Sequence, residues 1–207
     1  MNEPLNQILI LFAHPRFEQS RINRALLRAA AGVPGVTVHD LYEEFPDFNI
    51  QVEQEKALLA KAQIVIWQHP LYMYGAPALL KQWLDLVLEF GWAHGKDGSA
   101  LQGKIVFNVL TSGGARESYR RTGRNRFTIA ELLAPFDQTA SLCQMIYLPP
   151  FAVQGTYLLT DQELDDHAAR YRRLLDRLAK GDFQADALKG RSFLNDWPDL
   201  ALQGQTP

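Results

Sequence analysis

The chain has 207 residues, a formal net charge of −2 and 47% hydrophobic residues, which fits one ordinary globular domain. Its near-neutral charge gives no general attraction for nucleic acid, so no nucleic acid is expected as a partner. The single cysteine, Cys143, excludes an internal disulfide. No apolar run approaches the roughly 20 residues of a membrane-spanning helix, and residues 1–7 do not resemble a secretory signal. We expect a cytoplasmic protein, and peripheral binding to the inner face of a membrane is compatible with this sequence.

Five apolar runs predict β-strands, at residues 8–13, 35–40, 64–67, 105–110 and 145–148. The first, third and fourth are continuously apolar, which is typical of parallel strands covered on both faces. The second is mixed and indicates an edge strand. Proline has no N–H to donate to a sheet, so Pro149 and Pro150 are expected to end the fifth run.

Helical patterns separate these runs, at residues 23–31, 54–61, 77–88, 127–134 and 162–178. Strand and helix alternate, which predicts a doubly wound α/β sheet. We assign residues 1–180 to this domain. Residues 181–207 differ in character, with scattered aromatic residues among polar ones. This tail is expected to be an arm on the body or on a partner, or to fray.

The loop after the first strand contains no glycine, which excludes a P-loop or a dinucleotide-binding turn there. It offers a helix N-terminus instead, with the Ser20 hydroxyl, the backbone amides of Arg21, Ile22 and Asn23, and the imidazole of His14. Such a set suits a phosphate dianion. The alternative is that Ser20 only caps the helix and that His14 lies on the surface.

The loops after the third and fourth strands suggest a flat ligand. The third-strand loop is stiff and aromatic and contains Pro70, Leu71, Tyr72, Met73 and Tyr74. It suits the wall of an apolar ligand site, although a packed loop over the sheet end is the simpler interpretation.

The fourth-strand loop contains Thr111, Ser112, Gly113 and Gly114, and Tyr119 follows. The adjacent glycines allow the backbone to approach a ligand closely, whereas alone they indicate only a turn. Ligands of such sheets bind at the carboxyl ends of the strands, where all three loops meet. A phosphate cradle, an aromatic wall and a glycine turn together predict a site for flavin mononucleotide (FMN).

Three motifs resemble those of the flavodoxin-like NAD(P)H:quinone oxidoreductases. They are His14 with Ser20-x-x-Asn23, the segment from His69 to Asp85, and Thr111-Ser112-Gly113-Gly114. Two further segments, 40–50 and 91–95, are most similar to KefF and KefG, the ancillary proteins of glutathione-gated potassium efflux systems. The resemblance covers about residues 8–178. It implies a three-layer flavodoxin-like sandwich with a five-stranded parallel sheet in the order 2-1-3-4-5.

The resemblance also implies bound FMN, NADH or NADPH as co-substrate, a homodimer, and a two-step cycle that ends with reduction of a quinone. His14 and residues 20–23 would hold the phosphate, and residues 70–74 and 111–114 would frame the flavin ring. Tyr119 corresponds to a tyrosine that steadies the charge of the reduced flavin in larger family members. Asn125 stands where those members have a histidine, and asparagine cannot carry a proton.

Other polar residues have weaker interpretations. No metal site is expected, because the histidines and Cys143 lack ligand spacing. His69 is expected to brace its loop or to donate a proton. The arginines at 116, 120, 121, 124 and 126 either attract an anionic group or keep a loop soluble.

Two functions remain open from the sequence. One is a free-standing quinone reductase, and the other is a regulatory subunit of a potassium/proton antiporter with the flavin site as a sensor. A simple electron-carrying flavodoxin fits less well, since such carriers usually steer onto partners by a strong net charge.

Overall fold

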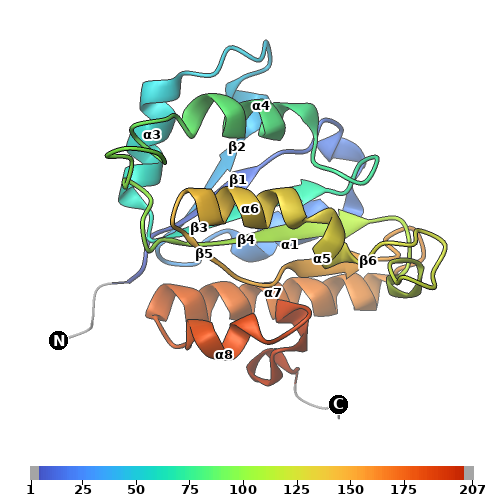
Figure 1. Ribbon diagram of the computed structural model, residues 1–207. Helices are drawn as coiled ribbons and strands as arrows, with labels where there is room; N and C mark the ends of the chain where they lie inside the picture. Colours follow the sequence, from blue (N-terminus) through green and yellow to red (C-terminus); the bar gives the residue numbers. More distant parts are fainter. Residues whose placement is uncertain (1–4, 203–207) are drawn as a thin grey trace.

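A computed structural model describes residues 5–202 and contains a parallel β-sheet with helices on both faces (Figure 1). The strands are β1 (Ile8–Phe12), β2 (Val36–Asp40), β3 (Ile64–Pro70), β4 (Ile105–Ser112), β5 (Ile146–Tyr147) and β6 (Phe151–Gln154). Their order is β2-β1-β3-β4-β5, and β6 also pairs with β4. Every pair is parallel. This order confirms the predicted flavodoxin-like topology.

The fifth strand position is occupied by two short segments. β5 pairs with Ile105 and Val106 of β4, and β6 pairs with the stretch from Val109 to Ser112. Pro149 and Pro150 lie between the two segments and end β5, as expected. The sequence did not predict β6. Because this strand lies at the edge of the sheet, pairing can resume beyond the prolines, and the chain is carried to the same sheet end as β4.

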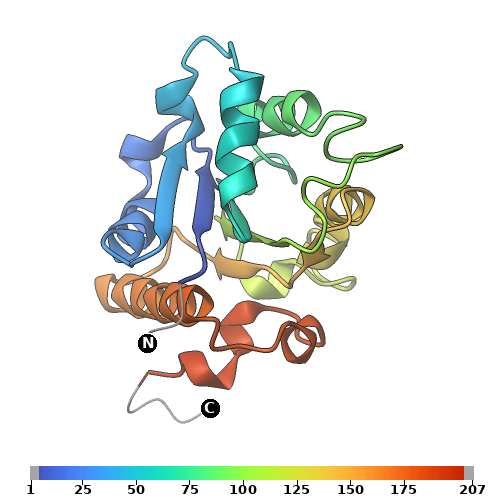
Figure 2. The same ribbon diagram turned by 90° about the vertical axis from the view of Figure 1, so that its left-hand side faces the viewer.

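The helices are α1 (Arg21–Ala30), α2 (Leu41–Glu44), α3 (Val52–Lys61), α4 (Ala78–Val87), α5 (Ile129–Leu132), α6 (Ala134–Leu142), α7 (Asp161–Lys180) and α8 (Ala185–Lys189). α1 and α7 lie side by side on one face, and α3, α4 and α6 cover the other (Figures 1 and 2). The single helix expected at 127–134 is in fact α5 followed by α6. Pro135 lies in the first turn of α6, where proline favours a helix start.

The sheet separates two apolar cores. Along β1, Leu9 and Leu11 face the core that contains Trp67 and Trp83. Ile8, Ile10 and Phe12 face the other core, against α1 and α7. Successive strand side chains point to opposite faces, so a continuously apolar strand is what two covered faces require.

The described part of the tail, residues 181–202, packs on the α7 side of the molecule (Figure 2). Leu188, Leu194, Trp197 and Leu200 are buried in that core. The Arg177 guanidinium lies 5.0 Å from the centre of the Trp197 ring and pairs with Asp199 at 2.7 Å. This stretch is therefore an arm on the body of its own chain.

Residues 1–4, for which no secretory signal is expected, and residues 203–207 of the tail lie outside the described residues. Within residues 5–202, no helix is both long enough and apolar enough to span a bilayer.

Candidate functional site

The carboxyl ends of β1, β3 and β4 lie on the right-hand side of Figure 1. A cavity of about 380 Å³ lies at these strand ends. This volume is within the usual range for small-molecule sites. All three loops singled out in the sequence contribute to it. The predicted residues that line it are His14, Ser20, Arg21, Ile22, Pro70, Leu71, Tyr72, Thr111, Ser112 and Gly113. Chain segments almost 100 residues apart thus meet as the doubly wound topology requires.

At the corner formed by α1, a helix start faces the cavity. Ser20 is the N-cap, and its Oγ accepts a hydrogen bond from the Asn23 amide at 3.2 Å. The Asn23 amide therefore already has an acceptor at the helix start. The amides of Arg21 and Ile22 lie in the first turn, where no intrahelical acceptor exists. They and the helix dipole favour a bound phosphate.

His14 presents an N–H at the same corner. Its Nδ1 accepts from the backbone amide of Arg16 at 3.1 Å, so the ring proton is carried by Nε2. Burial lowers the pKa of His14, and the nearby Glu18 carboxylate opposes this effect. A neutral imidazole with Nε2–H can donate to a phosphate oxygen without a net charge of its own.

Asn23 does not line the cavity but fixes its parts relative to one another. Its side chain is fully buried. Nδ2 donates to Ser20 Oγ at 3.0 Å and to Thr111 Oγ1 at 3.1 Å, and Oδ1 accepts from Gln68 Nε2 at 3.4 Å. One side chain thus joins α1 to β3 and β4. Its observed role is to position the cavity, and contact with a ligand stays a prediction.

The loop after the third strand has one part that lines the cavity and one part that forms an exposed tip. Pro70, Leu71 and Tyr72 line the cavity. The Leu71 amide donates to the Thr111 carbonyl at 2.8 Å, which holds the loop against β4. Met73 and Tyr74 have φ of 45° and 68° at the tip, and Met73 is 92% exposed. Neither residue lines this cavity, so their predicted contact with a flavin is untested.

The two glycines of the fourth-strand loop have different surroundings. Gly113 lines the cavity, and a Cβ there would lie 2.2 Å from the Tyr157 ring. Gly114 faces Tyr119 instead, and a Cβ added at Gly114 would lie 3.1 Å from the Tyr119 hydroxyl oxygen. Tyr119 lines a different cavity. Its predicted catalytic role is untested.

Four further residues line the cavity that the sequence did not single out: Arg16, Gln19, Thr156 and Tyr157. The first two lie in the first-strand loop. The other two follow β6, and only the resumption of the strand after Pro150 brings them to this end. Burial raises the pKa of Tyr72, and the nearby Tyr157 adds to this shift. Among the residues described, no three His, Cys, Asp or Glu side chains gather as a metal site would require.

A buried hydrogen-bonded chain braces the cavity wall from behind. His69 Nδ1 lies 3.0 Å from the Pro70 carbonyl oxygen, and because that oxygen only accepts, Nδ1 carries the proton. Nε2 then accepts from Asn108 Nδ2 at 3.0 Å. Asn108 Oδ1 in turn accepts from the Tyr147 hydroxyl. His69 is fully buried and does not line the cavity, so of its two interpretations the structure favours the bracing role.

This burial makes His69 a source of pH-dependent stability. Desolvation lowers its pKa to about 4, whereas the unfolded chain has about 6.5. The unfolded state therefore takes up a proton first as the pH falls. The contribution of about 3 kcal/mol is fully present above pH 6.5 and is lost between about pH 6.5 and 4. When the pH is lowered through this window, the free energy of unfolding of His69→Gln should fall by about 3 kcal/mol less than that of wild type. Equal pH slopes for both proteins in urea titrations would contradict the assignment.

Comparison with known protein families identifies the family of this chain. Residues 6–175 match the family model described as flavodoxin-like fold, so the chain belongs to that family.

Individual relatives extend the comparison. The chain is 44% identical over 171 residues to a protein named glutathione-regulated potassium-efflux system ancillary protein KefG, from Serratia proteamaculans, covering 83% of this chain and 93% of that protein. It is 37% identical to general stress protein 14 of Treponema denticola in complex with FMN, with a TM-score of 0.79 over 83% of this chain and 99% of that one. An NADPH-quinone reductase from P. pentosaceus is 34% identical, with a TM-score of 0.75 over 82% of this chain and 97% of that one.

Proposed function

We propose that this chain is an FMN-dependent NAD(P)H:quinone oxidoreductase. The observation that carries the proposal is the meeting of an anion-binding helix start, a flat wall and a close-approach glycine in one cavity. The relatives support it, since one is described in complex with FMN and another as an NADPH-quinone reductase. FMN would supply the two-electron carrier between nicotinamide and quinone, so no protein nucleophile is needed.

In this proposal, the residues of the chain bind FMN and orient it. The amides of Arg21 and Ile22, the Ser20 hydroxyl and His14 Nε2–H would hold the phosphate. Pro70, Leu71 and Tyr72 would support the ring system, and the Gly113 amide would approach its polar edge, where reduction places negative charge. Tyr119 would act through Gly114, against which its ring lies. Asn125 accepts from the Tyr74 hydroxyl at 3.5 Å and would hold the loop tip without carrying a proton.

The purified protein is expected to be yellow, or to become so on addition of FMN. NADH or NADPH should bleach its flavin absorbance, and a quinone should restore it. If the nicotinamide leaves before the quinone enters, double-reciprocal plots at several quinone concentrations should be parallel. A protein that stays colourless in excess FMN would overturn the proposal, and intersecting lines would overturn the two-step cycle alone.

A separate prediction concerns Ser20, at the proposed phosphate site. Ser20→Ala should weaken FMN binding by about tenfold, because a hydrogen bond to a charged group is lost. Riboflavin lacks the phosphate and should bind wild type and variant equally. The matched control is Thr160→Ala, which removes the cap of α7 at a residue that does not line the cavity. Both variants should lose about 1 kcal/mol of stability, and only Ser20→Ala should lose FMN affinity. Equal FMN titration curves would remove Ser20 from the site.

We further propose that two copies associate through a groove between α4 and α6. The groove has a volume of about 510 Å³ and is mostly apolar, with Tyr74 and Leu142 more than half exposed at its edge. Phe90, which follows α4 in the chain, is 72% exposed, whereas Trp83 is buried in the core. Exposed apolar patches of this kind often mark a surface at which proteins associate. Light scattering should give twice the mass of the 23.4 kDa chain.

The similarity to KefG favours a second candidate function, that of an ancillary subunit at the inner face of the cell membrane. In that case the flavin site would sense redox state for a potassium/proton antiporter. Potassium efflux from cells that co-express the antiporter should then depend on this chain. Rapid quinone turnover without any effect on efflux would leave the enzyme function alone.

A further inference from the structure

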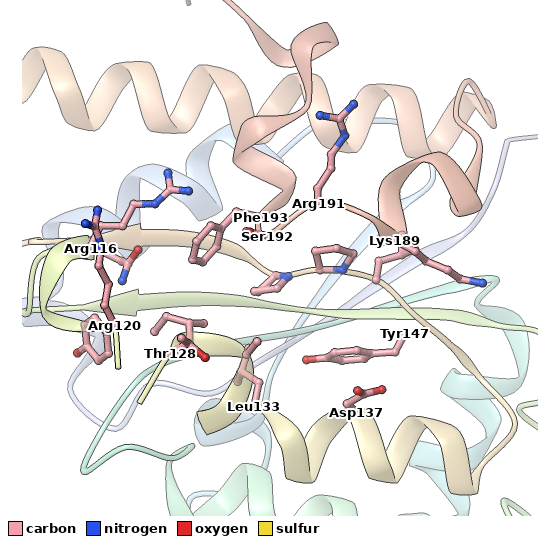
Figure 3. Close-up of a pocket in the computed structure, with 17 residues that line it drawn as sticks. Arg116, Arg120, Thr128, Leu133, Asp137, Tyr147, Lys189, Arg191, Ser192 and Phe193 are labelled. Atoms are coloured by element: carbon pink, nitrogen blue, oxygen red, sulfur yellow. The ribbon is translucent and has the colours of Figure 1, made fainter. Parts of the chain in front are cut away.

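A second cavity has a volume of about 660 Å³ and shares no lining residue with the proposed flavin site. It lies at the open edge of the sheet, between the tail on one side and α5 and α6 on the other (Figure 3). Tail residues Lys189, Arg191, Ser192 and Phe193 form part of its wall. The family match ends at residue 175, so these tail residues lie outside the matched stretch.

One end of the cavity is built from donors and cations. Arg116 and Arg120 lie there together with Phe193 (Figure 3). Arg116 is held by Asp196 at 2.9 Å and lies over the Phe193 ring at 4.6 Å. Within residues 5–202, the ion-pair partner of Arg120 is Glu117, at 4.0 Å. Two of the five arginines noted in the sequence are thus directed to a cavity by the fold.

A buried donor at the cavity lacks an acceptor. The side-chain nitrogen of Gln154, at the end of β6, is out of contact with solvent, and it has no hydrogen-bond acceptor among the described residues. Leaving a buried donor unpaired costs free energy, so a ligand oxygen at this position would be stabilised. Together with the arginines, this donor favours an anionic group with several oxygens.

The rest of the cavity suits a flat ring with a donor group. Pro149, Pro150 and Leu133 provide apolar walls. Tyr147 and Asp137 lie at the end away from Arg116 and Arg120 (Figure 3). A carboxylate only accepts hydrogen bonds, so Asp137 favours an N–H donor on the ligand. The volume is within the range for nucleotide-sized molecules.

From this juxtaposition we infer that the cavity binds a purine nucleotide with an amino group on its ring. The phosphate is bound by Arg116, Arg120 and Gln154, and the ring lies between the prolines and Phe193 with its amino group toward Asp137. The nucleotide is either a free monophosphate or the adenosine end of the nicotinamide co-substrate. The second source rests on the proposed function, and the first does not.

The test is calorimetric titration of the full chain, saturated with FMN, with 5′-AMP. AMP should bind at least about tenfold more tightly than adenosine or inorganic phosphate, since only AMP uses both ends of the cavity. Should the chain not bind FMN, the same titration on the flavin-free protein still tests the inference. Competition of FMN with AMP for one site would overturn it, as would equal affinities for the three probes.

Variants locate the binding. Arg120→Gln and Gln154→Met should each weaken AMP by about tenfold and leave adenosine unchanged. Arg124→Gln is the matched control, because Arg124 belongs to the same arginine run and does not line the cavity. Inosine monophosphate carries a carbonyl in place of the amino group and should bind wild type less tightly than AMP. Asp137→Asn can donate to that carbonyl and should reverse the preference. Variants that bind AMP as wild type does would overturn the inference.

The source of the nucleotide follows from kinetics. If Arg120→Gln raises the KM for NADH or NADPH with kcat unchanged, the cavity holds the adenosine end of the co-substrate. If that KM is unchanged while AMP binding is lost, the nucleotide is a separate ligand. Both results support the inferred site and differ only in the source of the nucleotide. The results that would overturn the site are those of the calorimetric titrations.

Discussion

Gly113→Val is expected to lose FMN almost completely while the fold persists. A Cβ at this position points into the cavity and would lie 2.2 Å from the ring of Tyr157. Without ligand the Tyr157 ring can turn away, since it is 86% exposed. With FMN bound, the added methyl groups occupy space that the ligand needs. Overpacking costs roughly 1–3 kcal/mol, so the dissociation constant should rise by about 100-fold at the upper end.

The neighbouring glycine provides the control. Gly114→Ala adds a Cβ that faces Tyr119, outside the cavity. FMN affinity should then fall by less than in Gly113→Val, because the added Cβ meets Tyr119 and does not enter the cavity. Fluorescence titration of FMN measures both variants, and urea unfolding checks that each remains folded. If the two substitutions had equal effects on FMN, the turn would not approach the cofactor as we propose.

Asn23→Leu is expected to cost about 2–4 kcal/mol of folding stability, the largest loss that we predict for one side chain. The leucine leaves Gln68 Nε2 without its buried acceptor and removes the donor to Ser20 and Thr111. FMN affinity should fall as well, although Asn23 does not line the cavity, because the Ser20 hydroxyl loses its orientation.

Asn125→Leu is the matched control for this substitution. Asn125 makes a long 3.5 Å contact with Tyr74 at an exposed loop tip. Its replacement should change the free energy of unfolding by about 0.5 kcal/mol or less. Chemical denaturation of both variants decides the matter. An Asn23 variant as stable as wild type would show that the buried network contributes little.

The sequence by itself determined the layers of the fold and the edge at which the site lies. Continuous apolar runs such as 8–13 and 105–110 specify parallel strands covered on both faces, and both strands are present in the structure. Once those strands are parallel, their following loops must share one sheet end. Ser20 and Gly113 were therefore identifiable as neighbours from local patterns alone.

Only the tertiary structure decided which side of each loop faces the cavity. Asn23 resembled a helix-start residue, and its role depends on Gln68 and Thr111, which are distant in sequence. Tyr157 reaches the cavity because β6 resumes after Pro150. The second cavity exists because the tail folds back on the body. Periodicity and capping act over a few residues, whereas side-chain direction and cavity shape are set by packing between segments far apart in the chain.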